Sequence, residues 1–180
     1  MIKNVIFDIG NVLLDFCWKD HIARFGFQGE KADRIAQAMM LGPIWPKLDL
    51  GLESDEDILE QFVAHTPELE QEIRLVFSDL STIVREYEGS VDWIESLKAR
   101  GYHTYYLSNY GERIRREASK ELSFLSHMDG GIMSYTVHLA KPDPAIYQTL
   151  LDRYGLKAEE CVFLDDTVRN VEAAQALGIA

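Results

Sequence analysis

The chain has 180 residues, 47% of them apolar, so it can form one sizeable hydrophobic core and is not expected to be disordered. Its net charge of −12 argues against a nucleic-acid or anionic membrane partner. Two cysteines are too few for a disulfide framework or a zinc site, and no leader or membrane-spanning stretch is visible, so we expect a cytoplasmic protein.

The N-terminal stretch contains an apolar run that ends in one carboxylate. Residues 5–7, Val-Ile-Phe, predict a buried strand, and Gly10-Asn11 indicates a turn shortly after it. Asp8 directly follows the strand, where open α/β sheets bind their ligands. We therefore interpret Asp8 as a candidate nucleophile.

Residues 16–86 carry helical patterns and no strand pattern. Ser54 is a suitable N-cap for one helix, and Pro67 suits the first turn of another. We expect helices over residues 19–25, 30–41, 55–65 and 67–87. This stretch is therefore predicted to be an all-helical cap inserted after the first strand.

Strand and helix patterns alternate in the rest of the chain. We expect strands over residues 102–107, 131–137 (a strand or hairpin arm) and 161–164, and helices over 91–100, 112–122, 145–154 and 168–177. This alternation predicts an α/β fold with a doubly wound parallel sheet, a Rossmann-like core. The core would comprise residues 1–15 and 87–180. Ile179-Ala180 would begin a further strand, so the last strand of this core is expected to be missing.

Polar groups are expected at four strand ends. They are Asp8, Ser108-Asn109, Lys141 and Asp165-Asp166. Each has an ordinary structural explanation as a turn or capping residue. Together, however, they fall at one edge of one parallel sheet, where a ligand site is expected.

The chemistry of these groups is complementary. Clustered carboxylates suit Mg²⁺, which prefers one or two carboxylates together with a substrate phosphate. Lys141 and the metal would neutralise an incoming phosphoryl group, and the Ser108 hydroxyl could hold its oxygens. Asp8 could then attack phosphorus and form an aspartyl phosphate.

Four motifs resemble those of the haloacid dehalogenase-like hydrolase superfamily over most of the chain. They are VIFDIGNV, YYLSN, AKPDP and VFLDD, the last followed by Asn170. The resemblance implies that Asp8 is the nucleophile, that Ser108 and Asn109 bind substrate, and that Lys141 neutralises charge. It also implies that Asp8, Asp165, Asp166 and the Gly10 carbonyl serve Mg²⁺, directly or through water.

One position departs from the usual pattern of the superfamily. Most of its phosphatases carry a second aspartate two residues after the nucleophile as general acid and base, whereas this chain has Gly10 there. An α-glucose-1-phosphatase-type branch is similar in carrying this glycine. We expect Asp15, or a cap residue such as His21, to supply part of the proton transfer, although Asp15 could equally be a solvated or capping residue.

The sequence therefore predicts a Mg²⁺-dependent phosphomonoester hydrolase. Its partner would be a small phosphorylated metabolite, with a sugar phosphate suggested by the resemblance alone. A haloacid dehalogenase-type hydrolase and a catalytically weakened binding protein remain open alternatives, as does the oligomeric state. A phosphotransfer receiver domain fits poorly, because its paired acids would follow the first strand instead of Cys161–Leu164.

Overall fold

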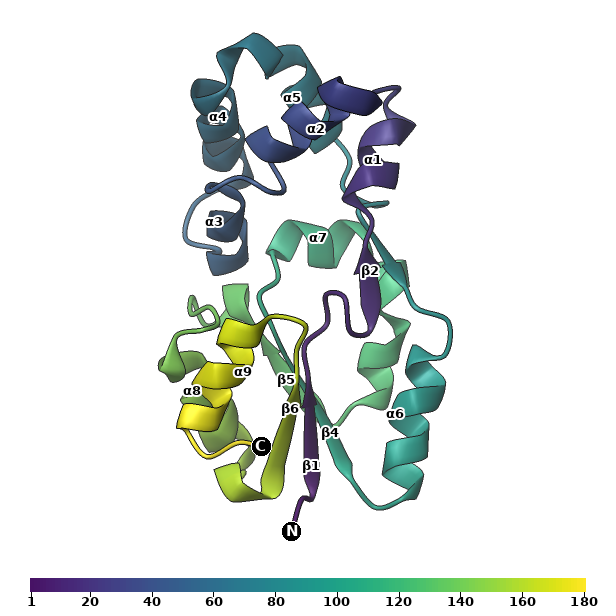
Figure 1. Ribbon diagram of the computed structural model, residues 1–180, viewed down its shortest axis with the longest axis vertical. Coiled ribbons are helices and arrows are strands. Elements are labelled where there is room, and N and C mark those ends of the chain that lie inside the picture. Colours follow the sequence, from purple (N-terminus) through teal and green to yellow (C-terminus); the bar gives the residue numbers. More distant parts are fainter.

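A computed structural model describes the whole chain, residues 1–180, and contains a four-stranded parallel sheet. Its strands are β1 (Asn4–Phe7), β4 (His103–Ser108), β5 (Gly130–Met133) and β6 (Cys161–Leu164), in the order β5-β4-β1-β6 (Figure 1). The chain builds β4 and β5 on one side of β1 and then returns to place β6 on the other. The strand order therefore reverses beside β1, which is where such sheets bind ligands.

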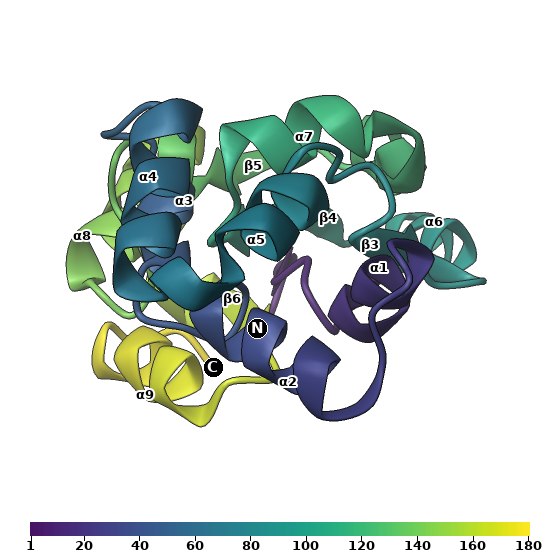
Figure 2. The ribbon, with the colours of Figure 1, turned by 90° about the horizontal axis from the view of Figure 1, so that it is seen from above.

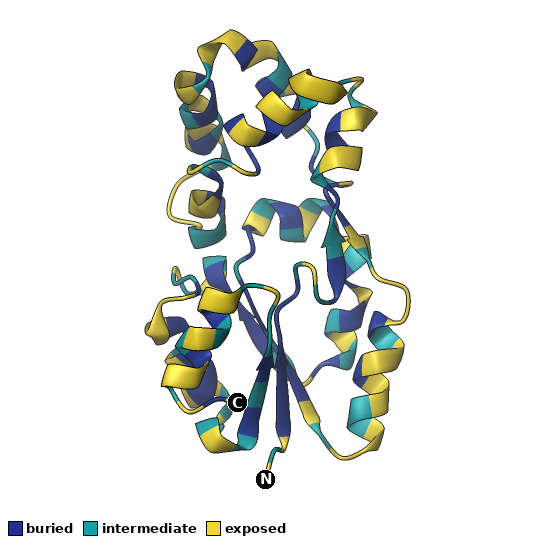
Figure 3. Cartoon of the chain, in the orientation of Figure 1, coloured by how far each residue is buried: buried dark blue, intermediate teal, exposed yellow.

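Helices cover both faces of the sheet, as Figures 1 and 2 show. One face carries α6 (Ser90–Ala99) and the 3₁₀ segment η2 (Ser119–His127), and the other carries α8 (Pro144–Tyr154) and α9 (Val168–Ala176). Helix α7 (Glu112–Glu117) follows β4 and lies toward the cap, and the 3₁₀ turn η4 (Ala158–Glu160) directly precedes β6. Val5 and Phe7 of β1 join the core that includes Ile94 of α6, whereas Ile6 joins a second core with residues of α8. The sheet is therefore buried on both sides (Figure 3), and the predicted doubly wound core is confirmed.

Five helices between residues 16 and 84 form the cap. They are α1 (Trp18–Arg24), α2 (Gly29–Ala38), α3 (Trp45–Leu50), α4 (Asp55–His65) and α5 (Glu70–Phe77), with the 3₁₀ turn η1 (Pro67–Leu69) before α5. Figure 1 shows the cap beyond the carboxyl ends of the sheet strands. Ser54 is the N-cap of α4, as predicted, because its hydroxyl accepts from the Asp57 amide at 3.1 Å. The short helix α3 was not predicted.

The expectation of a purely helical segment over residues 16–86 is wrong at its two ends. Strands β2 (Leu14–Phe16) and β3 (Val84–Glu86) pair antiparallel, so the expected helix over residues 67–87 ends at Phe77. The chain after Phe77 is rich in serine and β-branched residues, which favour turns and strands over helix. This two-stranded ribbon connects the core to the cap.

Two further expectations need correction. The helix expected over residues 112–122 ends at Glu117 and continues as η2, whose kink at Leu122 lets the Ser123 amide donate to the Glu86 carboxylate at 3.1 Å. The strand expected over residues 131–137 ends at Met133 and is followed by the 3₁₀ turn η3 (Ser134–Thr136).

The C-terminal residues lie against the outer edge of β6. The Ala180 amide donates to the Cys161 carbonyl at 3.0 Å, and its carbonyl accepts from the Phe163 amide at 2.9 Å. These residues therefore extend the ladder beside β6 where a further strand was expected. None of the helices combines the length and apolar character needed to span a bilayer.

Candidate active site

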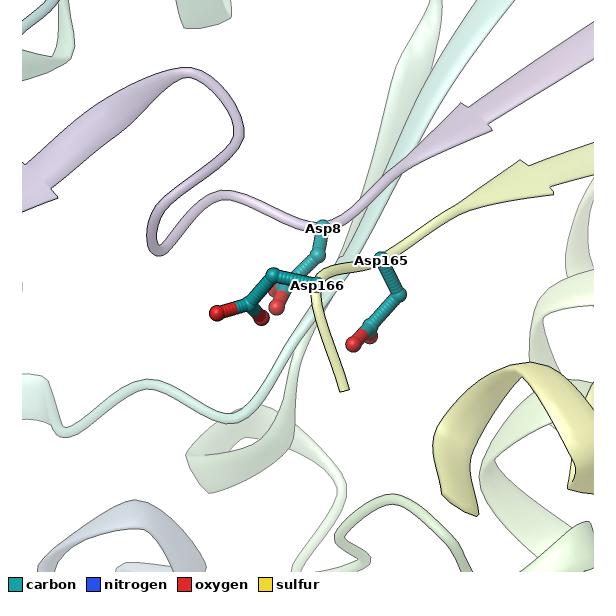
Figure 4. A group of neighbouring side chains, drawn as sticks. All are labelled: Asp8, Asp165 and Asp166. Carbon is teal, nitrogen blue, oxygen red and sulfur yellow. The ribbon is translucent and has the colours of Figure 1, made fainter. Parts of the chain in front are cut away.

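Three aspartates meet at the carboxyl ends of β1 and β6. Phe7 pairs with Leu164, so Asp8 and Asp165, the residues that follow them, lie next to each other. Carboxylate oxygens of Asp8, Asp165 and Asp166 lie within 4.8 Å of one another (Figure 4). The parallel register thus brings Asp8 to two acids from the far end of the chain, Asp165 and Asp166.

Lys141 supplies the positive charge of this cluster. Its Nζ lies 2.9 Å from Asp8 Oδ1 and 2.6 Å from Asp165 Oδ2. The side chains of Lys141 and Asp165 are almost fully buried, with exposed fractions of 1% and 0%. A buried charge is tolerated only when it is paired, so this arrangement fixes the positions of all three groups.

Asn109 holds the backbone of Lys141. Its Oδ1 accepts from the Lys141 amide at 2.7 Å, and its Nδ2 donates to the Lys141 carbonyl at 3.0 Å. Both ends of the amide are therefore occupied. Asn109 also lines the cavity beside Asp8, but these contacts make it a positioning residue for the lysine.

Asp165 and Asp166 differ in how many of their oxygens are available. Asp165 accepts from Lys141, from the Thr167 amide at 2.8 Å and from Asn170 Nδ2 at 3.0 and 3.1 Å, so both its oxygens are engaged. Asp166 is exposed and accepts from Asn11 Nδ2 at 2.9 Å. Asp166 is therefore the more accessible acid at the end of β6.

Burial and neighbouring charges act in opposite directions on Asp8. Burial raises the pKa of its carboxyl, whereas the Lys141 ammonium and the Ser108 hydroxyl lower it. The nearby Asp165 charge raises the pKa again. Additional positive charge at the site would therefore favour the ionised form of Asp8.

The donor set fits a hard divalent cation such as Mg²⁺. Asp8 and Asp166 offer carboxylate oxygens, and Gly10, whose carbonyl is the third donor expected from the sequence, lines the same cavity. Oxygen-only sets with one or two carboxylates are those that Mg²⁺ prefers. Because both oxygens of Asp165 are hydrogen-bonded, we expect it to act through water or through Lys141.

Asp8 lines a cavity of about 200 Å³ between the core and the cap. Polar groups from the core line one end, including Asp8, Gly10, Asn11, Asn109, Asp166 and Thr167. Apolar side chains line the rest: Leu14, Phe16, Trp45, Val84 and Ile114. The lining contains three carboxylates and no lysine, arginine or histidine.

The structure does not bring all the expected residues into this cavity. Asp15 lines a separate surface hollow, and its carboxylate accepts from the Cys17 thiol at 3.2 Å. His21 is fully buried, with Nδ1 2.9 Å from Thr82 Oγ1 and Nε2 3.2 Å from the Val76 carbonyl. Neither of these residues is among those that line the cavity.

Two ionisable lining residues were not expected from the sequence. Asp49 comes from α3 of the cap, and Tyr110 follows β4. The only sequence signal for Asp49 is a single carboxylate between Leu48 and Leu50 on a short apolar segment. Burial raises the pKa of Asp49 to about 7, with the negative charge of Asp8 adding to the shift.

The structure thus combines a doubly wound parallel sheet with a cluster of three aspartates at the carboxyl ends of its strands. The family model for haloacid dehalogenase-like hydrolases matches residues 2–178. The chain therefore belongs to this family and is a hydrolase.

Curated relatives include both phosphatases and dehalogenases. The sesquiterpene phosphatase astK of Aspergillus oryzae is 25% identical over 98% of this chain and 87% of its own length. The (S)-2-haloacid dehalogenase 1 of a Pseudomonas species is 24% identical over 98% and 82%. Acyl-CoA dehydrogenase family member 10 of Mus musculus is 29% identical over 98% of this chain, which corresponds to 17% of that longer protein.

Solved structures share the fold. The HAD family enzyme BT-2542 of Bacteroides thetaiotaomicron, solved in complex with magnesium and inorganic phosphate, superposes with a TM-score of 0.75. The match covers 100% of this chain and 92% of that chain, at 23% sequence identity. At this identity the match establishes the fold alone.

The raised pKa of Asp49 predicts a pH-dependent effect on stability. Between its ordinary value of 3.8 and about 7, the folded chain holds a proton that the unfolded chain releases, so stability falls as pH rises. Asp49→Asn removes this loss. Without divalent metal, we expect the variant to match the wild type near about pH 4 and to gain roughly 2 kcal/mol in free energy of unfolding near about pH 8.

Urea denaturation at both pH values measures this difference. Asp33→Asn is the matched control, because Asp33 is an exposed cap aspartate without a hydrogen bond or ion pair. It should unfold like the wild type throughout. An Asp49→Asn variant whose stability difference did not grow with pH would contradict the prediction.

Proposed function

We propose that the protein is a Mg²⁺-dependent phosphomonoester hydrolase that acts through an aspartyl phosphate on Asp8. The observation that carries this proposal is the composition of the cavity lining, which has three carboxylates and no basic side chain. An anionic substrate can enter such a cavity only with a cation beside it. Lys141, which is paired with Asp8, supplies one positive charge. A divalent ion, for which Asp8 and Asp166 are suitable ligands, would be the second source of positive charge.

Each residue of the cluster has a role in this reaction. The Asp8 carboxylate attacks phosphorus, the bond to the leaving oxygen breaks, and the electron pair leaves with that oxygen. Water then attacks the aspartyl phosphate, and the Asp8 oxygen regains its electron pair as phosphate is released. Lys141 stabilises the charge near Asp8, while Asn109 and Asp165 hold the lysine in place.

Asp8, Asp166 and the Gly10 carbonyl would hold the metal. When bound, Mg²⁺ would supply positive charge that keeps Asp8 ionised and neutralises the phosphoryl oxygens. Ser108 is 1% exposed and acts on the Asp8 carboxyl, so we assign its hydroxyl to phosphate binding and to orienting the nucleophile.

The comparisons support phosphoryl transfer. The relative astK is named a sesquiterpene phosphatase, and BT-2542, which has the same fold, was solved with magnesium and phosphate. The negative charges of Asp8 and the accessible Asp166 would repel each other unless a cation lay between them. We retain the cytoplasm as the expected location.

We further propose that residues 16–86 form the cap and select a small phosphorylated metabolite. Sugar phosphates are suggested by sequence resemblance, whereas the apolar walls of the cavity favour a leaving group with an apolar face. Phe16 and Trp45, with ring centroids 6.0 Å apart, form part of this wall. A polyhydroxylated leaving group would leave many of its hydroxyls unpaired against these side chains.

A dehalogenase is the alternative function, and the similarity to (S)-2-haloacid dehalogenase 1 favours it. Asp8 would then displace halide from carbon without a metal. The substrate carboxylate would, however, meet a cavity with no basic side chain. A weakened binding protein is a second alternative, motivated by Gly10.

The phosphatase proposal predicts that Asp8→Asn abolishes the release of p-nitrophenolate from p-nitrophenyl phosphate, because the amide is a poor nucleophile. EDTA should abolish activity in the wild type, and added Mg²⁺ should restore it. Asp33→Asn, on the exposed face of α2, is the control and should retain full activity. Activity that survives both Asp8→Asn and EDTA would refute the mechanism.

The substrate proposals are separated by a panel of aryl phosphates, prenyl and alkyl phosphates, and sugar phosphates, together with 2-chloropropionate. We expect phosphate release and no halide release, and kcat/KM about 10-fold or more higher for the apolar leaving groups than for sugars. Metal-independent chloride release would support the dehalogenase instead. A preference for sugar phosphates would show that the apolar walls do not set specificity.

A further inference from the structure

The end of β1 lacks a proton donor for the leaving group. Gly10 has no side chain, and a Cβ built on it would meet no atom within 4 Å. Lys141 is paired with two carboxylates, and both oxygens of Asp165 are hydrogen-bonded. A group that protonates an alkoxide must therefore come from another part of the cavity.

Asp49 is the one carboxyl group in the cavity lining that the cap contributes. Its side chain makes no hydrogen bond and no ion pair, whereas Asp8 and Asp166 are both paired. The charges of Asp8 and Lys141 both act on the Asp49 carboxyl, so the group lies within electrostatic reach of the reaction centre. Tyr110 lines the same cavity, and its buried hydroxyl has no hydrogen-bond partner.

Contacts with the core fix the backbone of Asp49. Ser134 Oγ donates to the Asp49 carbonyl and accepts from the Tyr110 amide at 2.9 Å. His138 Nδ1 lies 2.8 Å from the next carbonyl, that of Leu50. Although Asp49 belongs to a cap helix, the segment after β5 therefore determines its position.

Gly51 allows this close approach. Its φ of +61° lies in the left-handed region, and a Cβ there would lie 3.0 Å from Tyr135 Cβ. Helix α3 consequently ends directly against η3. The approach fixes the backbone of Asp49 beside the cavity, on a helix instead of a loop.

The surroundings of Asp49 suit proton transfer in both directions. Trp45, Phe16 and Ile114 make the adjoining walls apolar, which favours the neutral acid. The resulting pKa of about 7 leaves both forms populated near neutral pH. A general acid that must also act as a base works best with a pKa near the operating pH.

We propose that Asp49 is the general acid and base of this enzyme, in place of the side chain that Gly10 lacks. The inference rests on the phosphatase function proposed above. As Asp8 attacks and the P–O bond breaks, the protonated Asp49 gives its proton to the leaving oxygen, and the alcohol departs. The Asp49 carboxylate then takes a proton from the water that attacks the aspartyl phosphate, which regenerates the acid.

Asp49→Asn tests this role through its dependence on the leaving group. An alkoxide needs a proton to leave, whereas p-nitrophenolate does not. We expect kcat/KM for an alkyl phosphate to fall about 10²–10⁴-fold, and for p-nitrophenyl phosphate to fall less than about 10-fold. The wild-type decline in alkyl phosphate kcat/KM above about pH 7 should disappear in the variant.

The second half of the reaction provides an independent readout. Without a base for the attacking water, the phosphorylated enzyme should accumulate. Rapid mixing of Asp49→Asn with p-nitrophenyl phosphate should give a burst of about one nitrophenolate per active site. Asp33→Asn, the exposed cap control, should show the wild-type rate, pH profile and burst.

Gly10→Asp provides the rescue, because the space around Gly10 admits a side chain. In the Asp49→Asn background it should restore alkyl phosphate turnover by about 10-fold or more, since it returns an acid to the vicinity of Asp8. An equal loss with both substrates, an unchanged pH profile and no rescue would together overturn the role of Asp49. The same selective loss in Asp15→Asn instead would assign the role to Asp15.

The experiments distinguish an incorrect role for Asp49 from an incorrect phosphatase function. If the wild type releases no phosphate, or if Asp8→Asn remains active, the phosphatase function is wrong and the role of Asp49 falls with it. If Asp8 is essential but Asp49→Asn behaves like Asp33→Asn, only the role of Asp49 is overturned. Thermal unfolding of each variant verifies that the chain is folded.

Discussion

The buried ammonium group of Lys141 determines how the catalytic end of the sheet is arranged. It lies between Asp8 of β1 and Asp165 of β6, and its side chain is almost completely shielded from water. Removing one partner of a buried pair typically costs about 3–5 kcal/mol, because the other charge is left uncompensated. The two strand ends and the loop that carries Lys141 must therefore keep their relative positions, and Asn109 clamps that loop to the end of β4.

The balance between the charges of Lys141 and the surrounding aspartates also determines what can bind in the cavity. Lys141 balances only part of the negative charge of Asp8 and Asp165, and Asp166 adds more at the accessible end. Asp49 avoids adding a further full charge because its apolar surroundings favour the neutral form. A divalent cation would cancel the excess negative charge of the three aspartates over Lys141, so the free site is predisposed to bind one, and the bound cation would in turn lower the cost of bringing in a phosphoryl group.

The sequence predicted the core because buried parallel strands appear as apolar runs with polar residues at their ends. Asp8, Ser108, Lys141 and Asp165-Asp166 could be assigned to one sheet edge for that reason. It could not predict the ribbon of Leu14–Phe16 with Val84–Glu86, since three-residue strands carry no periodicity and their partners are about 70 residues apart. Asp49 was also missed, because its place depends on contacts with Ser134 and His138 that no local pattern records.

Placing the acid on the cap instead of on β1 changes how substrate choice and rate are coupled. A donor two residues after Asp8 would remain beside the nucleophile whatever the cap does. Asp49 instead shares the short helix α3 with Trp45, which lines the apolar wall that contacts the leaving group. A substitution that reshapes this wall therefore also displaces the proton donor, so specificity and acid catalysis change together. The contacts of Ser134 and His138 with α3 maintain this coupling, because they attach the helix to the same core that contains Asp8.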